Sequence, residues 1–164
     1  MFDRNITSPV ERALADNAHW LLRSALVGVF GYHGILKFMD LNGFSAMLSL
    51  SITEVSLVAL AQVTGSGLLI IGGLRRDGIF DVATRVGAAL NLPVMIGAIV
   101  LVHWGRWNFV PSETHPLGGM EFQVVLALVM LYLVITGNRA FSVVTSDSTP
   151  SNAAAIPSLA SQAI

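Results

Sequence analysis

Long apolar segments, separated by short groups of charged residues, dominate the pattern of this chain. The segments 55–74 and 86–105 each contain twenty residues without an acidic or basic side chain, and the segment 122–138 contains seventeen. A helix needs about 20 mostly apolar residues to cross the hydrocarbon core of a bilayer. Each of these three segments is therefore predicted to form a membrane-spanning helix.

A fourth apolar segment, at about 18–39, is interrupted by Arg23, His33 and Lys37. Arg23 and Lys37 lie near its ends, where a long side chain can extend toward the lipid headgroups. A backbone that crosses lipid must satisfy its own hydrogen bonds, which favours helices. The prediction is an all-α fold, an integral membrane four-helix bundle with short connections.

The predicted boundaries follow from the apolar segments and the charged residues that separate them. The spans are about 18–39, 54–74, 83–105 and 120–138, within one domain at 18–140. Residues 1–17 are predicted to form a cytoplasmic arm that is helical from Pro9, with Ser8 as its cap. The uncharged segment 41–50 is predicted to be a short interfacial piece. Residues 141–164, rich in Ser, Ala and Pro, are predicted to be a disordered cytoplasmic tail.

Basic residues are distributed unequally between the two ends of the predicted spans. With the N-terminus inside, only Lys37 and Arg106 face outward. Seven arginines lie on or near the other side: Arg4, Arg12, Arg23, Arg75, Arg76, Arg85 and Arg139. The positive-inside rule therefore predicts both termini in the cytoplasm, an N-in/C-in topology.

Composition supports the membrane class and excludes several others. Hydrophobic residues make up 54% of the chain and charged residues 12%, with a mean hydropathy of +0.70, whereas a soluble domain carries about 25% charged residues. The net charge of -1 gives no reason to expect a nucleic-acid partner. Cysteine is absent, which excludes disulfides and thiolate-held metal or iron–sulfur centres in this sequence.

Small residues recur along the predicted spans, where they would let neighbouring helices approach closely. The residues expected at helix contacts are Gly28, Gly31, Gly34, Gly65, Ser66, Gly67, Gly72, Gly87 and Gly97.

Polar residues from all four spans are predicted to meet in the outer half of the bundle. At 1.5 Å per residue, His33, Lys37, Glu54, His103 and Glu121 fall in this outer half, with Gln62 about 12 Å deeper than Glu54 and Gln123 two residues after Glu121. The expected pairs are Lys37 with Glu54 or Glu121, and His103 with Glu121. Two interpretations stay open: a structural network that fixes helix register, or a small-molecule pocket.

Haem and metal chemistry are both weaker explanations of this polar cluster. His33 and His103 could in principle ligate a haem between facing helices, but no second histidine pair supports it, so haem is not expected. A metal site built from His103, Glu113, His115 and Glu121 matches no compact ligand spacing, so none is predicted.

Other residues of the stretch 103–122 are predicted to lie in a loop or at the membrane interface. Glu113 and His115 are expected in a solvated loop between two prolines. Trp104, Trp107 and Phe109 are predicted to be aromatic anchors at the outer membrane interface.

Four stretches resemble the DoxX family, which consists of small four-helix membrane proteins of bacteria and archaea. They are RSALVGVFGYHGILKF, GSGLLIIGGLRR, NLPVMIGAIVLVHW and GGMEFQVVLALVMLYLVITG, and the resemblance spans about residues 20–140. Positions that match residue types common in the family are Arg23, Gly34, Lys37, Gly72, Arg76, His103 and Glu121. The family often has a glutamate where this chain has Gln62, so if that carboxylate carries protons in relatives, this protein must do without it or use Glu54.

The resemblance implies a multi-pass protein of the bacterial inner membrane. The family takes its name from a subunit of a membrane enzyme that passes electrons from thiosulfate to quinone. Three hypotheses follow. The first is a subunit of a quinone-linked oxidoreductase, in which His33 and His103 bond the quinone carbonyls, Lys37 stabilises the reduced anion and Glu121 relays protons. The others are a non-catalytic accessory subunit and a small-solute permease. The expected partners are lipid and other membrane subunits, with quinone as a non-covalent ligand and no covalently bound cofactor.

Overall fold

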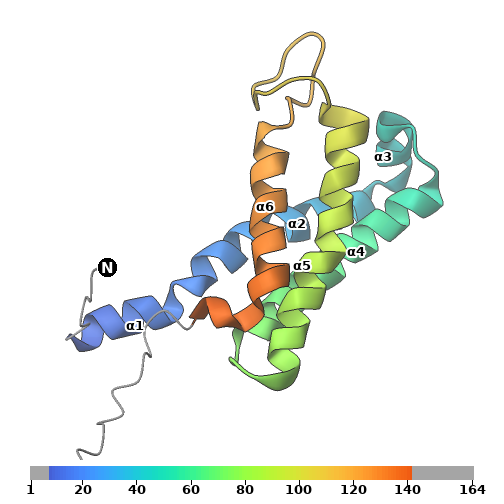
Figure 1. Cartoon of the computed structure of the whole chain (residues 1–164). Helices are drawn as coiled ribbons and strands as arrows, with labels where there is room; N and C mark the ends of the chain where they lie inside the picture. Colours follow the sequence, from blue (N-terminus) through green and yellow to red (C-terminus); the bar gives the residue numbers. More distant parts are fainter. Residues whose placement is uncertain (1–7, 142–164) are drawn as a thin grey trace, which may run out of the picture.

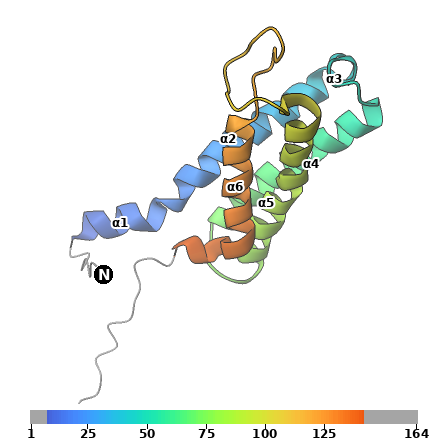
Figure 2. The ribbon, with the colours of Figure 1, turned by 45° about the horizontal axis from the view of Figure 1, so that its top comes forward.

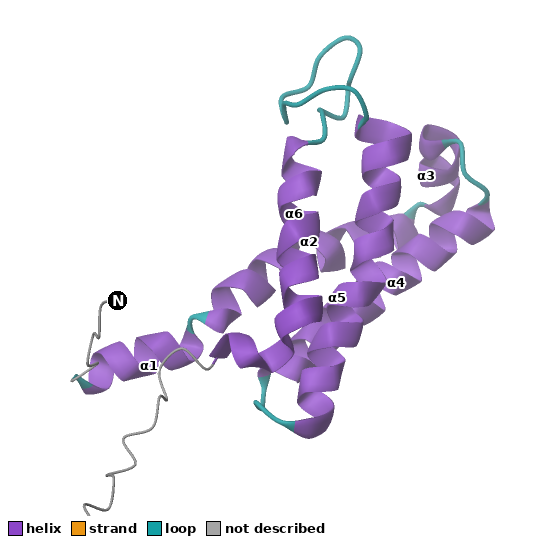
Figure 3. Cartoon of the chain, viewed as in Figure 1, coloured by secondary structure: helices purple, strands orange, loops and turns teal. Residues whose placement is uncertain are grey.

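The computed structural model describes residues 8–141, and every regular element in that part of the chain is a helix or helical turn (Figures 1 and 3). The elements are α1 (Pro9–Asn17), α2 (His19–Met39), α3 (Leu41–Leu48), α4 (Ile52–Gly73), α5 (Gly78–Ala98), the π-helical turn η1 (Ile99–His103), α6 (Glu121–Thr136) and the 3₁₀ turn η2 (Gly137–Phe141). The all-α prediction is confirmed for these residues. Residues 142–164 of the predicted tail lie outside the described part.

Helix α1 begins where the sequence predicted it to begin. The Ser8 hydroxyl accepts a hydrogen bond from the backbone N–H of Glu11 at 3.1 Å, and the Glu11 carboxylate accepts one from the Ser8 N–H at 3.3 Å. This reciprocal capping box satisfies two backbone donors that the first turn leaves free. An ion pair of 2.6 Å between Asp16 and Arg76 ties α1 to the connection after α4.

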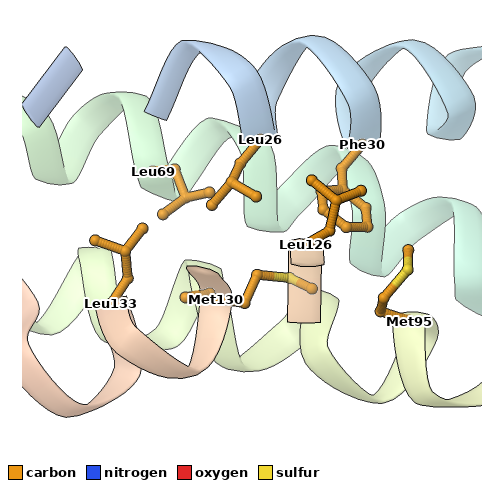
Figure 4. Packing of buried hydrophobic residues seen from close by; sticks show 8 residues of the cluster. Leu26, Phe30, Leu69, Met95, Leu126, Met130 and Leu133 are labelled. Atoms are coloured by element: carbon orange, nitrogen blue, oxygen red, sulfur yellow. The ribbon is translucent and has the colours of Figure 1, made fainter. Parts of the chain in front are cut away.

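Two pairs of helices form the body of the protein. Helix α4 packs against both α2 and α5, and α6 packs against α5. Figures 1 and 2 show α2 and α4 running obliquely across the layer formed by α5 and α6. Both layers contribute side chains to one buried cluster, shown in Figure 4: Leu26, Phe30, Leu69, Ala88, Met95, Leu126, Met130 and Leu133.

Glycine allows the closest helix contact, between α4 and α5. A Cβ added at Gly65 would lie 2.8 Å from the carbonyl oxygen of Gly87, and one added at Gly87 would lie 2.8 Å from that of Gly65. The predicted contact role of these two residues is confirmed. It is wrong for Gly28, Gly67 and Gly97, where an added Cβ would meet nothing within 4 Å.

Three helices among the described residues are long and apolar enough to cross a membrane: Ile52–Gly73, Gly78–His103 and Glu121–Arg139. They correspond to the three spans without charged interruptions, although α5 begins at Gly78 rather than near residue 83. Helix α2 does not meet the same criterion. The chain is therefore a multi-pass membrane protein, and three of its described helices have the length and composition of membrane spans.

One connection is longer than the short connections expected. Residues 104–120 join η1 to α6 and fold back on themselves, with hydrogen bonds from Gly119 N–H to the Asn108 carbonyl at 2.6 Å and from Met120 N–H to the Arg106 carbonyl at 2.9 Å. This loop closes one end of the α5–α6 pair.

Candidate functional site

A cavity of about 500 Å³ lies at the end of the helices nearest the 104–120 loop, and we call it the loop-side cavity. Helices α2, α3, α4, α5 and α6 all contribute to its wall, together with η1 and the loop. Most of the wall is apolar, including Phe30, Met47, Val94 and Leu126. A cavity of this size, with few polar groups, suits a small organic ligand.

Lys37 provides the charge of this cavity. Its side chain is held inside because Gly34, one turn earlier, lets α2 approach α4, where an added Cβ would lie 3.2 Å from the carbonyl oxygen of Ala59. Lys37 is only 8% exposed. Its Nζ donates to Gln62 Oε1 at 3.0 Å and to the His33 carbonyl oxygen at 3.4 Å. The Nζ also lies 5.2 Å from the centre of the Phe44 ring of α3, a cation–π distance.

His103 is held from both sides at the end of η1. Its Nδ1 lies 2.8 Å from the Gly118 carbonyl oxygen, and its Nε2 lies 3.0 Å from Gln123 Nε2. A carbonyl oxygen can only accept, so Nδ1 carries the proton, and in a neutral imidazole Nε2 then accepts from the Gln123 amide. Both ring nitrogens are thus engaged with protein groups.

Four of the six predicted site residues line the loop-side cavity: His33, Lys37, Gln62 and His103. Glu54 and Glu121 do not. Glu54 is exposed and caps α4 by accepting from the Ser51 N–H and hydroxyl, both at 2.8 Å. The half-buried Glu121 carboxylate forms no hydrogen bond or ion pair with the described residues.

The expected ion pairs in this cluster are wrong. Lys37 bonds to Gln62 instead of Glu54 or Glu121, because Gln62 lies two helical turns deeper in α4, at the depth of the ammonium group. His103 bonds to Gln123 instead of Glu121. Positions two apart on a helix point about 200° apart, so the side chain that faces the cavity is Gln123. This periodicity shows that Glu121 and Gln123 face different ways, and the packing of α6 decides which of the two meets the cavity.

The loop residues take different positions from one another. Trp104, Trp107 and Phe109 are 67%, 62% and 63% exposed, which leaves them free to contact lipid headgroups, and their anchoring role stays a prediction. Glu113 is exposed, as expected. His115 is half-buried rather than solvated, with its Nε2 3.0 Å from the Trp104 carbonyl oxygen.

A second polar cluster lies at the opposite end of the helices, around Arg23. The expectation that Arg23 extends toward the headgroups is wrong, because its side chain turns inward and is 1% exposed. Its guanidinium donates to the Leu69 carbonyl and the Thr84 hydroxyl at 3.0 Å, and to Asn138 Oδ1 at 2.8 Å. Partners from α4, α5 and η2 replace the water that the charge would otherwise need.

Asn138 is the residue of this cluster that sequence reasoning missed. Its amide Nδ2 donates to the carbonyl oxygens of Gly72 and Arg75, and its backbone N–H donates to Asp81 at 2.6 Å. Asp81 also accepts from Arg85 at 2.8 Å, an ion pair within α5. A single asparagine after an apolar run carries no periodic signal, which is why only the fold reveals its role.

The family comparison confirms the resemblance seen in the sequence. The family model described as DoxX matches residues 18–104, which is more than half of the chain, and the chain belongs to this family. The matched region contains Arg23 and the four predicted residues that line the cavity, whereas Glu121 and α6 lie beyond it. No curated protein and no solved structure matches the chain.

Proposed function

We propose that this DoxX-family protein crosses the bacterial inner membrane four times, with both termini in the cytoplasm and the loop-side cavity in the outer half. Helix α2 is the fourth span. It has 21 residues, against 22 in α4, and packs along α4. Its two charged side chains, Arg23 and Lys37, are buried against other helices. The exposed side chains of α2 include Leu21, Leu22, Tyr32, Ile35 and Phe38, which suit contact with lipid.

The proposed ligand of the loop-side cavity is the headgroup of a quinone, bound without a covalent bond. The observation that carries this proposal is one cavity of about 500 Å³ with an apolar wall and polar groups from α2, α4, η1 and α6. An aromatic ring fits such a wall, and a carbonyl oxygen would accept a hydrogen bond from Lys37 Nζ. The exposed imidazole of His33 offers a further donor at the cavity wall.

The reaction class follows from the family and the residues together. We propose that the protein is a subunit of a membrane oxidoreductase complex and that electrons reach the quinone from a partner subunit. The chain itself has no cysteine to hold a thiolate redox centre. Its own residues would position the headgroup and exclude water.

Filling the cavity tests the ligand proposal. Gly97 lines the cavity, and an added Cβ there would meet nothing within 4 Å, so Gly97→Leu can start a side chain at the cavity wall and extend it toward the ligand space. Gly67 has the same free space but does not line the cavity, which makes Gly67→Leu the matched control. We expect calorimetric titration of the purified protein with a decyl-tailed ubiquinone analogue to show binding that Gly97→Leu weakens about tenfold, the effect of losing roughly 1.4 kcal/mol.

The control variant should bind the analogue as the unmodified protein does. Equal weakening in both variants would assign the effect to changed helix packing. Absence of binding by the unmodified protein would refute the quinone proposal.

A further inference from the structure

The charge inside the loop-side cavity has no counter-charge in its wall. Of the described residues that line the cavity, Lys37 is the only one with an acidic or permanently basic side chain. The two ion pairs of the described residues, Asp16–Arg76 and Asp81–Arg85, involve none of the cavity-lining residues. Neither Glu54 nor Glu121 lines the cavity, so the wall presents one ammonium group and no carboxylate.

The partners of Lys37 are neutral oxygens and a ring. Two of its three N–H groups are directed to Gln62 Oε1 and the His33 carbonyl oxygen, which leaves one for another acceptor. A cation held away from water is costly unless a negative group pairs with it. Phe44 on α3 adds a favourable but smaller contact at 5.2 Å. An occupant that brings its own negative oxygen would therefore gain more here than a neutral one.

The rest of the wall determines what else this occupant must be. Phe30, Met47, Leu48, Val94 and Leu126 line the same space. A small hydrated anion would lose its water against these side chains and gain a single ammonium partner in return. An apolar body is needed to gain from the wall, so charge and apolar surface must be combined in one molecule.

We propose that the ligand of the loop-side cavity is an acidic aromatic amphiphile, which binds as an anion with its charged oxygen on Lys37 Nζ. This inference rests on the proposed function, since it assigns an ionised oxygen to the headgroup that the cavity holds. It gives Lys37 a role in ligand selection that the neutral amide of Gln62 cannot perform.

A pair of probes that differ only in ionisation tests this inference. A 3-alkyl-2-hydroxy-1,4-naphthoquinone is an anion at neutral pH, because its hydroxyl is conjugated to a carbonyl, whereas its 2-methoxy ether has the same ring and tail and stays neutral. We expect the full-length protein in mild detergent to bind the hydroxy probe at least about tenfold more tightly in calorimetric titrations, as expected for an added charge-assisted hydrogen bond.

Lys37→Met should remove this preference, since methionine fills a similar space without charge. The variant should bind the two probes with equal affinity, and its loss of affinity for the hydroxy probe should exceed its loss for the methoxy probe. Lys37→Gln provides a second neutral variant should Lys37→Met fail to fold, and Glu54→Gln, outside the cavity, is the control that should keep the full preference.

The outcomes separate this inference from the proposed function. Equal binding of both probes by the unmodified protein would overturn the anionic assignment and leave the quinone pocket intact. A preference that survives in both neutral Lys37 variants would overturn the role of Lys37. Failure of both probes and of the decyl-tailed ubiquinone analogue to bind would refute the proposed function itself.

Discussion

At the residue scale, the two buried cations among the described residues, Arg23 and Lys37, have different surroundings. Arg23 is enclosed by oxygen acceptors from three elements, so its charge serves to join helices. Lys37 has one amide oxygen and one backbone carbonyl as acceptors and lies against a cavity. The guanidinium group, with five donors in a rigid plane, suits the first task, and the compact ammonium group suits the second.

This contrast predicts the effect of removing Arg23. Arg23→Met should lower the free energy of unfolding by about 3 kcal/mol, because it removes the donor from the Thr84 hydroxyl and the Leu69 carbonyl and leaves Asn138 Oδ1 with the Thr84 hydroxyl as its remaining donor. Denaturant titration in mixed micelles measures this loss. Arg139→Met is the control, since Arg139 is exposed and its replacement should change stability by less than about 0.5 kcal/mol. Similar stability of the two variants would show that the Arg23 cluster does not hold the helices together.

At the element scale, contact between α4 and α5 depends on two glycines that face each other, and small residues are the usual means of close helix approach in membranes. Gly65 and Gly87 bring the two backbones together. The approach of α2 to α4 at Gly34 in turn presents Gln62, one turn before Gly65 in α4, to Lys37. The packing that stabilises the fold therefore also shapes the cavity.

The glycine contact predicts opposite effects for two small substitutions. Gly87→Ala should lower the free energy of unfolding by about 1–3 kcal/mol, because its methyl group would lie against the Gly65 backbone carbonyl, which cannot rotate away. Gly67→Ala should raise it by up to about 1 kcal/mol, because alanine is the better helix former and the space is open. Unfolding titrations that show a loss for both variants would contradict this account of the α4–α5 contact.

At the scale of the whole molecule, the number of spans determines on which sides of the membrane the chain ends lie. The three helices with sufficient apolar length would place the residues before α4 and those after α6 on opposite sides. If α2 is a fourth span, the residues before α2 and those after α6 lie on the same side. In the proposed N-in/C-in topology, the Arg23 cluster lies in the cytoplasmic half of the membrane and the loop-side cavity in the outer half.

The absence of cysteine makes this topology testable by labelling. Single cysteines at three exposed positions, Ala13→Cys in α1, Glu113→Cys in the loop and Arg139→Cys in η2, report the two sides. We expect an impermeant maleimide to label only Glu113→Cys in spheroplasts, and the other two only after lysis. Labelling of Ala13→Cys and Arg139→Cys from opposite sides would reduce the spans to three and refute the four-span proposal.

The sequence by itself determined the elements and the class of protein. The helical segments, the start of α1 at its Ser8 cap and the membership of the DoxX family could all be predicted, because apolar run lengths, caps and family motifs are local properties of the chain. It also selected four residues that line the loop-side cavity. Depth along a helix follows from residue number alone, at a fixed rise per residue.

Only the tertiary structure decided which polar groups touch. The sequence suggested that Lys37 and His103 would pair with carboxylates, but the rotation of α4 and α6 about their axes presents Gln62 and Gln123 instead. It likewise placed Arg23 at the lipid surface, whereas Asn138, 115 residues away, draws it inside. Helix rotation and contacts between distant residues depend on packing against all neighbours at once, and no local pattern encodes them.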